Sequence, residues 1–366
     1  MKLYVNGVAT ATRSVGSFSR LRSSGTVRIG PDASSALLLL DEVKLSNVTR
    51  LPYEMGHYAN IRIHKAASSA LTDLIPDHLR SLRFQATGID RFSLSAAALG
   101  ETLFSDTILS KQRTTSCATC HEPNRFFTDG LAIARGKEPT DAGKRHTPTI
   151  INRLFSRFQG WSGEGISLDT QAIIPIEATH EMNLPVSEAV SRLTGNTTYA
   201  NRFQQVFGEG PTAQNIAISL ASFQATQLSP RTRVDNFRGG NRSALSASER
   251  RGLDLFEGKA RCSGCHAGVN YTDESFRNNG LTNDADAGRG EQTDRNRDHR
   301  LFKVPSLRNI ASTAPYMHDG SMMTLREVLE AYNRGAIDEL ARDSDIRPLE
   351  LSNQELQDLE AYLQAL

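Results

Sequence analysis

The sequence predicts a mainly α-helical protein in which two similar helical domains with long loops follow a short β-rich segment. Helical periodicity with N-terminal capping signals recurs after about residue 60. All four cysteines lie in two copies of one five-residue string, one in each helical domain. Alternating strand patterns are confined to the start of the chain. We therefore expect domains at residues 1–58, 59–235 and 236–366.

Strand-forming residues gather at the start of the chain. Residues 3–5 precede an Asn-Gly turn signal, and further runs cover 26–30 and 37–45. These strings resemble the last strands of a laminin-G or concanavalin-like jelly roll, which makes residues 1–58 a remnant of such a domain. Three or four strands can hardly bury a core of their own. An ordinary β extension folded onto the helical region is therefore the alternative.

The helical region begins after about residue 60 and is divided by a linker. Residues 229–242, which are rich in Pro, Gly, Arg and Asn, predict the boundary between its two parts. Capping boxes at Ser246-x-x-Glu249 and Ser352-x-x-Glu355 begin two of the expected helices. The segments with helical patterns are 95–103, 187–194, 213–227, 246–256, 324–333 and 352–366.

Charge and hydropathy exclude some partners. The chain has 42 basic and 41 acidic residues, so it offers no basic excess for nucleic acid or an anionic membrane surface. The longest aliphatic run, 36–40, is much shorter than a membrane span. We expect a soluble protein, a monomer or a homodimer, that acts on a small substrate or a redox protein.

The cysteine strings are Cys117-Ala-Thr-Cys120-His121 and Cys262-Ser-Gly-Cys265-His266. This pentapeptide is the attachment signature of haem c: two thiols one helical turn apart can add to the porphyrin vinyl groups, and the histidine that follows can reach the iron. Two disulfides, or one zinc site of four cysteines, are the alternatives. Both leave the two histidines unexplained in a chain with 9 histidines in 366 residues. We expect two cytochrome c-like domains with covalent haem.

Haem is attached to cysteine outside the bacterial cytoplasm, so we expect a periplasmic or exported protein. Residues 1–30 contain no apolar core of the length that a secretory signal needs. We therefore expect that the start of this chain is trimmed or misassigned.

Strings around the motifs resemble a known family. Residues 99–110, 126–130 and 313–320 are similar to those of the bacterial di-haem cytochrome c peroxidase and MauG family, and the resemblance runs from about residue 90 to the C-terminus. It implies that His121 and His266 are the proximal iron ligands.

The resemblance also implies a distal pocket over the first haem. Gln171, Pro175 and Glu181 have the family's spacing there, and a carboxylate beside an open iron can move the protons of hydrogen peroxide. Taken alone, Glu181 would be interpreted as a solvated acid.

Trp161, the only tryptophan, occupies a position where the family places an aromatic ring that carries electrons between the haems. Core packing is the alternative for a single tryptophan. The family follows this residue with Asp-Gly-Arg, whereas this chain has Ser162-Gly163-Glu164. The difference removes a positive partner, so we expect altered local geometry.

The resemblance implies an axial ligand for the second haem. The cytochrome c peroxidases of the family use a methionine fourteen residues after the histidine that corresponds to His318, and MauG uses a tyrosine; here the residue is Tyr332. A tyrosine oxygen favours higher oxidation states than a methionine sulfur. The competing ligands are Met317, Met322 and Met323, although clustered methionines more often serve packing.

The first haem is expected to be five-coordinate. Many family members close this site with a histidine in the loop that corresponds to 131–137, which contains none here. His146 is the remaining candidate for a sixth ligand. It also replaces an asparagine that binds calcium in the family, and imidazole suits that cation poorly. The backbone carbonyls of Thr313 and Pro315 remain candidate calcium ligands.

The leading functional prediction is a di-haem peroxidase. It would reduce hydrogen peroxide at the first haem and receive electrons through the second, from a small cytochrome c or a cupredoxin. The alternatives are a MauG-like oxidase of side chains in a protein substrate, an electron-transfer cytochrome without turnover, and a zinc-stabilised binding module.

Overall fold

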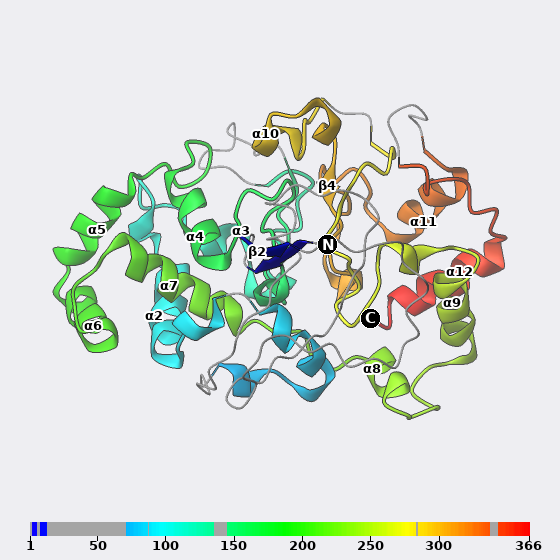
Figure 1. Ribbon diagram of the computed structural model, residues 1–366, viewed down its shortest axis with the longest axis horizontal. Helices are drawn as coiled ribbons and strands as arrows, with labels where there is room; N and C mark the ends of the chain where they lie inside the picture. The colour runs from blue at the N-terminus through cyan, green and yellow to red at the C-terminus, as the bar shows by residue number, and fades with distance from the viewer. Residues whose placement is uncertain are drawn as a thin grey trace. The chain divides into compact units, whose positions relative to one another are not determined.

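The computed structural model describes residues 2–5, 8–12, 71–86, 88–134, 145–282, 285–336 and 343–366 (Figure 1). The chain divides into two compact units, Met1–Ser68 and Ser69–Leu366. Among the described residues, no helix is both long and apolar enough to cross a lipid bilayer.

The first unit contains one described hairpin. Strands β1 (Lys2–Val5) and β2 (Val8–Thr12) pair antiparallel, with an irregularity between Leu3 and Tyr4. The strand predicted at 3–5 is therefore present. The strands predicted at 26–30 and 37–45 lie outside the described residues, so the jelly-roll remnant stays a prediction.

The second unit is mainly helical, as predicted. Its only described strands, β3 (Phe276–Arg277) and β4 (Phe302–Lys303), form a short antiparallel pair. The α-helices are α2 (Leu94–Ser105), α3 (Cys117–Cys120), α4 (Leu168–Glu177), α5 (Val186–Thr194), α6 (Thr197–Phe207), α7 (Ala213–Ala225), α8 (Arg233–Arg238), α9 (Ala247–Glu257), α10 (Gly290–Thr293), α11 (Leu325–Arg334) and α12 (Asn353–Leu363). The short 3₁₀ helices are Thr72–Leu74, Asp77–Gln85, Ile89–Arg91, Thr107–Leu109, Pro123–Arg125, Arg153–Phe155, Cys262–Gly264, Asn296–Asp298 and Ile310–Ser312.

The predicted helices correspond to α2, α5, α7, α9, α11 and α12. Both predicted capping boxes are present, since Ser246 and Glu249 begin α9 and Ser352 and Glu355 begin α12. Helices α4, α6, α8 and α10 were not predicted. Helix α4 contains Pro175, which lacks the N–H of an interior helical residue and so obscures the helical pattern.

A glycine permits the close crossing of two helices in each half of this unit. A Cβ atom at Gly100 of α2 would overlap the carbonyl oxygen of Ser219 in α7. A Cβ atom at Gly252 of α9 would overlap the carbonyl oxygen of Asp358 in α12. Both glycines stand four residues before a buried phenylalanine. The two halves therefore repeat the same helix contact.

Separate cores stabilise the two halves. The cores around α2, α4 and α7 use residues between 71 and 225, and the core around α9, α11 and α12 uses residues between 234 and 366. We call these ranges the first half and the second half. Figure 1 shows α2 and α4–α7 gathered on one side and α9, α11 and α12 on the other.

Candidate haem sites

The first cysteine string forms one helical turn. Helix α3 begins with a capping box between Ser116 and Thr119, and the N–H of His121 donates to the carbonyl oxygen of Cys117 at 2.9 Å. The His121 Nδ1 atom lies 3.1 Å from the carbonyl oxygen of Phe127. That contact leaves Nε2 as the ring nitrogen suited to ligate a metal.

The second string repeats this geometry. The N–H of His266 donates to the carbonyl oxygen of Cys262 at 2.9 Å, and His266 Nδ1 lies 3.0 Å from the carbonyl oxygen of Tyr271. All four cysteines are described, and none forms a disulfide. In the described part of the chain, no cluster of three or more His, Cys, Asp or Glu side chains could hold a metal ion. The disulfide and four-cysteine zinc alternatives therefore lack support.

Equivalent loop residues contact His121 and His266. The sequence Phe127-Thr-Asp after the first string corresponds to Tyr271-Thr-Asp after the second. Later carbonyls, those of Pro148 and Pro305, also contact the two rings. Burial lowers the pKa of both histidines, which favours the neutral imidazole that binds iron.

The loops around the two histidines differ at one position, which is His146 in the first half and Lys303 in the second. His146 and Lys303 stand two residues before the equivalent prolines, and both are 4% exposed. His146 Nδ1 lies 2.7 Å from the carbonyl oxygen of Leu131. Lys303 Nζ has no hydrogen-bond partner. The predictions that His146 is a sixth haem ligand and that Thr313 and Pro315 bind calcium stay untested.

Helix α4 carries two of the residues predicted for the distal pocket. Gln171 and Pro175 lie one turn apart and so share a face. The buried Oε1 atom of Gln171 has no hydrogen-bond partner, so it could accept a hydrogen bond from a bound ligand. The neighbouring Ala172 and Ile176 pack in the same core as Cys117.

Glu181 lies in the turn after α4. Its side chain is 42% exposed, and its Oε1 atom lies 3.6 Å from His180 Nε2. Partial burial raises the pKa of Glu181, and the charge of His180 opposes that rise. The negative charge of Glu181 contributes to raising the pKa of the Cys117 thiol, so it acts on the first cysteine string. A cavity of about 10 Å³, room for about one water molecule, lies between residues 110–115 and Glu181.

Trp161 connects the two halves. Its indole N–H donates to the carbonyl oxygen of His146 at 2.8 Å, and its own carbonyl oxygen accepts from the N–H of Lys303 at 2.8 Å. The ring meets His318 edge to face, with centroids 6.4 Å apart. His318 in turn stacks on Phe302 at 3.6 Å. Trp161, His318 and Phe302 therefore form a series of ring contacts that leads into the second half.

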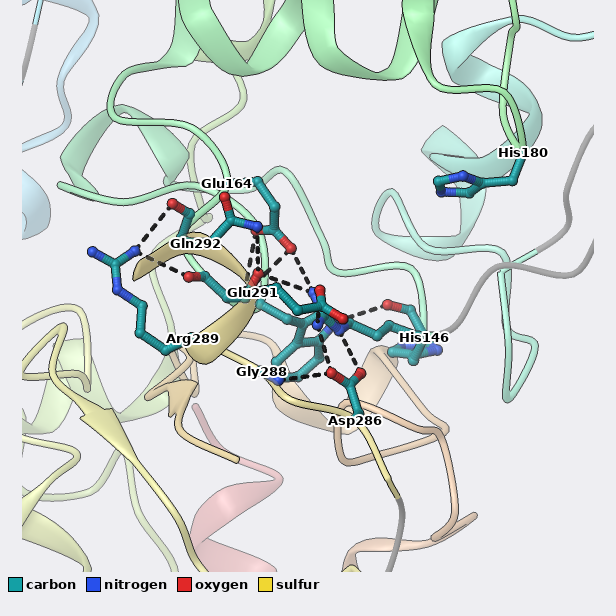
Figure 2. Close-up of polar contacts among 12 residues, drawn as sticks. His146, Glu164, His180, Asp286, Gly288, Arg289, Glu291 and Gln292 are labelled. Atoms are coloured by element: carbon teal, nitrogen blue, oxygen red, sulfur yellow. Dashed lines mark hydrogen bonds and ion pairs between the residues drawn. The ribbon is translucent and has the colours of Figure 1, made fainter. Parts of the chain in front are cut away.

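Arg145 binds three carboxylates, those of Glu164, Asp286 and Glu291, which Figure 2 labels. It donates to both oxygens of Asp286 at 2.7 Å and to Glu164 at 2.7 Å, and a further hydrogen bond of 2.9 Å reaches Glu291. Ser162 Oγ also accepts from Arg145, at 3.0 Å. Arg145 therefore supplies a positive charge at this loop, although Glu164 replaces the arginine of the family's string. Sequence analysis missed Arg145 because two of its partners lie about 140 residues away in the chain.

Tyr332 projects from α11 toward the second cysteine string. Asn279 Nδ2 donates to its hydroxyl oxygen at 3.3 Å and also lies 3.7 Å from Met317 Sδ. Burial raises the pKa of Tyr332 to about 12, and the thiols of Cys262 and Cys265 act in the same direction. Tyr332 packs against the same core as Cys262, and Tyr332 and Met317 share Asn279 as a neighbour.

The other two methionines lie elsewhere. Met322 packs against the core of the second half, and its carbonyl oxygen accepts from Tyr316 N–H at 2.7 Å. Met323 is 58% exposed. Of the three competing methionines, Met317 alone is placed by these contacts beside Tyr332.

Two Cys-x-x-Cys-His strings in matching helical halves are the arrangement of a di-haem c-type cytochrome. A family model described as di-haem cytochrome c peroxidase matches residues 95–243. MauG of Methylophilus methylotrophus is 38% identical over 279 residues, which cover 75% of this chain and 83% of that protein. Cytochrome-c peroxidase IdrP1 of Denitromonas iodatirespirans is 33% identical over 354 residues, covering 85% of this chain and 94% of that protein.

A solved structure agrees with these relatives. The crystal structure of a MauG-like protein associated with microbial copper homeostasis matches with a TM-score of 0.70 and 29% identity, covering 76% of this chain and 91% of that one. The chain belongs to the di-haem cytochrome c peroxidase and MauG family, and it is a peroxidase-type oxidoreductase. The resemblance inferred from residues 99–110, 126–130 and 313–320 is confirmed.

Proposed function

We propose that this protein reduces hydrogen peroxide at an open first haem and draws the electrons through a closed second haem. Cys117, Cys120 and His121 would hold the first haem. Cys262, Cys265 and His266 would hold the second. When bound, the first haem supplies an iron with one open position for peroxide. The domains that we propose for these sites are 59–235 and 236–366.

The unequal surroundings of the two strings are the observation that carries this proposal. The charge of Glu181 acts on Cys117 of the first string, and its carboxyl group would serve as the acid–base group there. Tyr332 packs against the same core as Cys262, and its phenol oxygen would ligate the iron of the second haem. One site is therefore suited to chemistry and the other to electron transfer.

Glu181 would move the proton of the substrate. Its carboxylate would take a proton from one oxygen of hydrogen peroxide and return it to the oxygen that leaves as water. A pKa raised by partial burial brings the group closer to the pH at which an acid–base catalyst works best. The cavity of about 10 Å³ beside it would let one water molecule exchange protons with solvent.

Gln171 and Pro175 would orient the substrate. The unpartnered Oε1 atom of Gln171 can accept a hydrogen bond from a peroxide hydroxyl or a water molecule. Pro175 adds an apolar wall one turn later and contributes no backbone N–H to the helix. Trp161 would carry electrons between the haems, since its ring continues through His318 to Phe302.

The electron donor in this proposal is a small cytochrome c or a cupredoxin in the periplasm or another exported location. A second candidate function is the oxidation of side chains in a partner protein, as proposed for a MauG-like enzyme. The observation that favours it is Tyr332, because a phenolate oxygen stabilises high oxidation states and weakens the second haem as an electron acceptor.

Spectra of the haem-loaded ferric protein test the proposal. We expect two haems per chain in a pyridine haemochrome assay, one high-spin and one low-spin, with cyanide converting only the high-spin haem. Hydrogen peroxide should then oxidise the protein without prior reduction. Two low-spin haems that neither bind cyanide nor react with peroxide would instead establish an electron-transfer cytochrome. Turnover with reduced cytochrome c separates the peroxidase from the side-chain oxidase.

A further inference from the structure

A buried lysine, Lys303, and a half-buried arginine, Arg153, lie near the carboxylate of Glu274. Lys303 is 4% exposed, and its Nζ atom has no hydrogen bond, with Glu274 Oε1 at 3.7 Å. Arg153 donates to Gln159 Oε1 at 2.9 Å and to the carbonyl oxygen of Phe158 at 2.6 Å, and both of these acceptors are neutral. Burial lowers the pKa of both cations, the direction expected when compensating negative charge is scarce.

The two carboxylates near Lys303 and Arg153 are shared with other hydrogen-bond donors. Glu274 Oε1 accepts from Ser156 Oγ at 2.8 Å, and its Oε2 atom has no partner. Glu164 also acts on both cations, but its Oε1 atom is bound by Arg145 at 2.7 Å. Because a buried ammonium without a hydrogen bond is unfavourable, and Glu274 approaches Lys303 Nζ only to 3.7 Å, the site is suited to a further anion from outside the chain.

The position of Lys303 indicates which anion this is. Its charge acts on His266, and Pro305, two residues later, contacts the same imidazole with its carbonyl oxygen. Its backbone N–H donates to Trp161. The only anionic groups that haem c carries are its propionates. On the two-haem assignment of the proposed function, we propose that Lys303, assisted by Arg153, binds a propionate of the second haem.

This contact would make the two haem sites unequal in charge. The equivalent position in the first half is His146, whose ring already contacts a carbonyl oxygen. A fixed positive charge near an iron stabilises Fe(II) relative to Fe(III), because the ferric state carries one more positive charge. Lys303 would therefore raise the midpoint potential of the second haem and oppose the preference of Tyr332 for the oxidised state.

Variants of Lys303 test the proposal in the haem-loaded protein. Lys303→Met should lower the midpoint potential of the second haem and shift the propionate bending band in resonance Raman spectra. Lys303→Arg should retain both values near those of the unaltered protein. Lys259→Met is the matched control, since Lys259 pairs with Glu355 on the surface of the same half, and neither readout should change.

Glu274→Gln gives an opposite and independent test. Removing this carboxylate should raise the second midpoint potential and strengthen the contact between Lys303 and the propionate, which shifts the same Raman band. An unchanged propionate band in Lys303→Met overturns the proposal, and it indicates that Lys303 is satisfied by Glu274 alone. If Lys303→Met does not load haem, an unchanged band in Glu274→Gln overturns it. Haem stoichiometry and the peroxide reaction report separately on the proposed function.

Discussion

The side-chain amide of Asn279 donates a hydrogen bond to the Tyr332 hydroxyl oxygen at 3.3 Å and lies 3.7 Å from Met317 Sδ. One amide therefore touches both residues that could close the second haem site. The tyrosine is half-buried, and desolvation raises the pKa of its phenol to about 12, so without iron it keeps its proton. Binding to a ferric ion would replace that proton, and Asn279 would then stabilise the phenolate oxygen.

Glu181→Gln should lower kcat/KM for hydrogen peroxide by about 10²- to 10⁴-fold, because glutamine cannot accept the substrate proton. Haem content and the ferric spectrum should remain unchanged, since no ligand is removed. Stopped-flow mixing with peroxide measures the rate. Glu177→Gln is the control, because Glu177 is exposed at the end of the same helix and its Oε1 atom accepts from Val186 N–H in a bond that glutamine preserves. Equal rates in the two variants would remove Glu181 from the mechanism.

The pH profile should depend on His180. Glu181 accepts a proton only as a carboxylate, so the rate should rise with pH through its raised pKa. The charge of protonated His180 lowers that pKa. His180→Gln should therefore move the acidic limb of kcat/KM to higher pH and leave the plateau rate similar. A limb that stays in place, or moves to lower pH, contradicts the assignment of this titration to Glu181.

Arg145→Gln should destabilise the protein by about 3 kcal/mol, because it leaves Glu164, Asp286 and Glu291 without their shared cation. Arg145→Lys should recover only part of the loss, since a lysine cannot reproduce the two-oxygen contact with Asp286. Denaturant unfolding of the haem-loaded protein measures both.

A surface ion pair provides the control for Arg145. Arg80 and Asp77 pair with 74% of each side chain exposed, so Arg80→Gln should cost less than about 1 kcal/mol. Similar losses in Arg145→Gln and Arg80→Gln would show that the Arg145 network contributes no more than a surface pair.

Local sequence signals predicted much of this fold. Capping boxes and apolar periodicity located the main helices because these signals act within a few residues. Helix α4 was missed because Pro175 interrupts the pattern from inside the helix. The β-rich remnant remains untested, since most of it lies outside the described residues.

The candidate sites were predictable where function follows from a short motif. His121 and His266 could be read directly from their strings, and Glu181 and Tyr332 required the family's spacing. The Arg145 network and the surroundings of Lys303 could not be predicted, because the residues in them meet only through tertiary folding. The repeated Pro148 and Pro305 positions were a signal in the sequence that would have aligned His146 with Lys303.

The ferric spectrum of Tyr332→Phe, recorded with that of Met317→Leu, is the most direct test of two unequal haems. If Tyr332 closes the second site, Tyr332→Phe should change the low-spin signal of the second haem and leave the high-spin first haem unaltered. Met317→Leu should leave both signals in place. An unchanged second-haem spectrum in Tyr332→Phe, with a changed one in Met317→Leu, would contradict the assignment and make methionine the ligand.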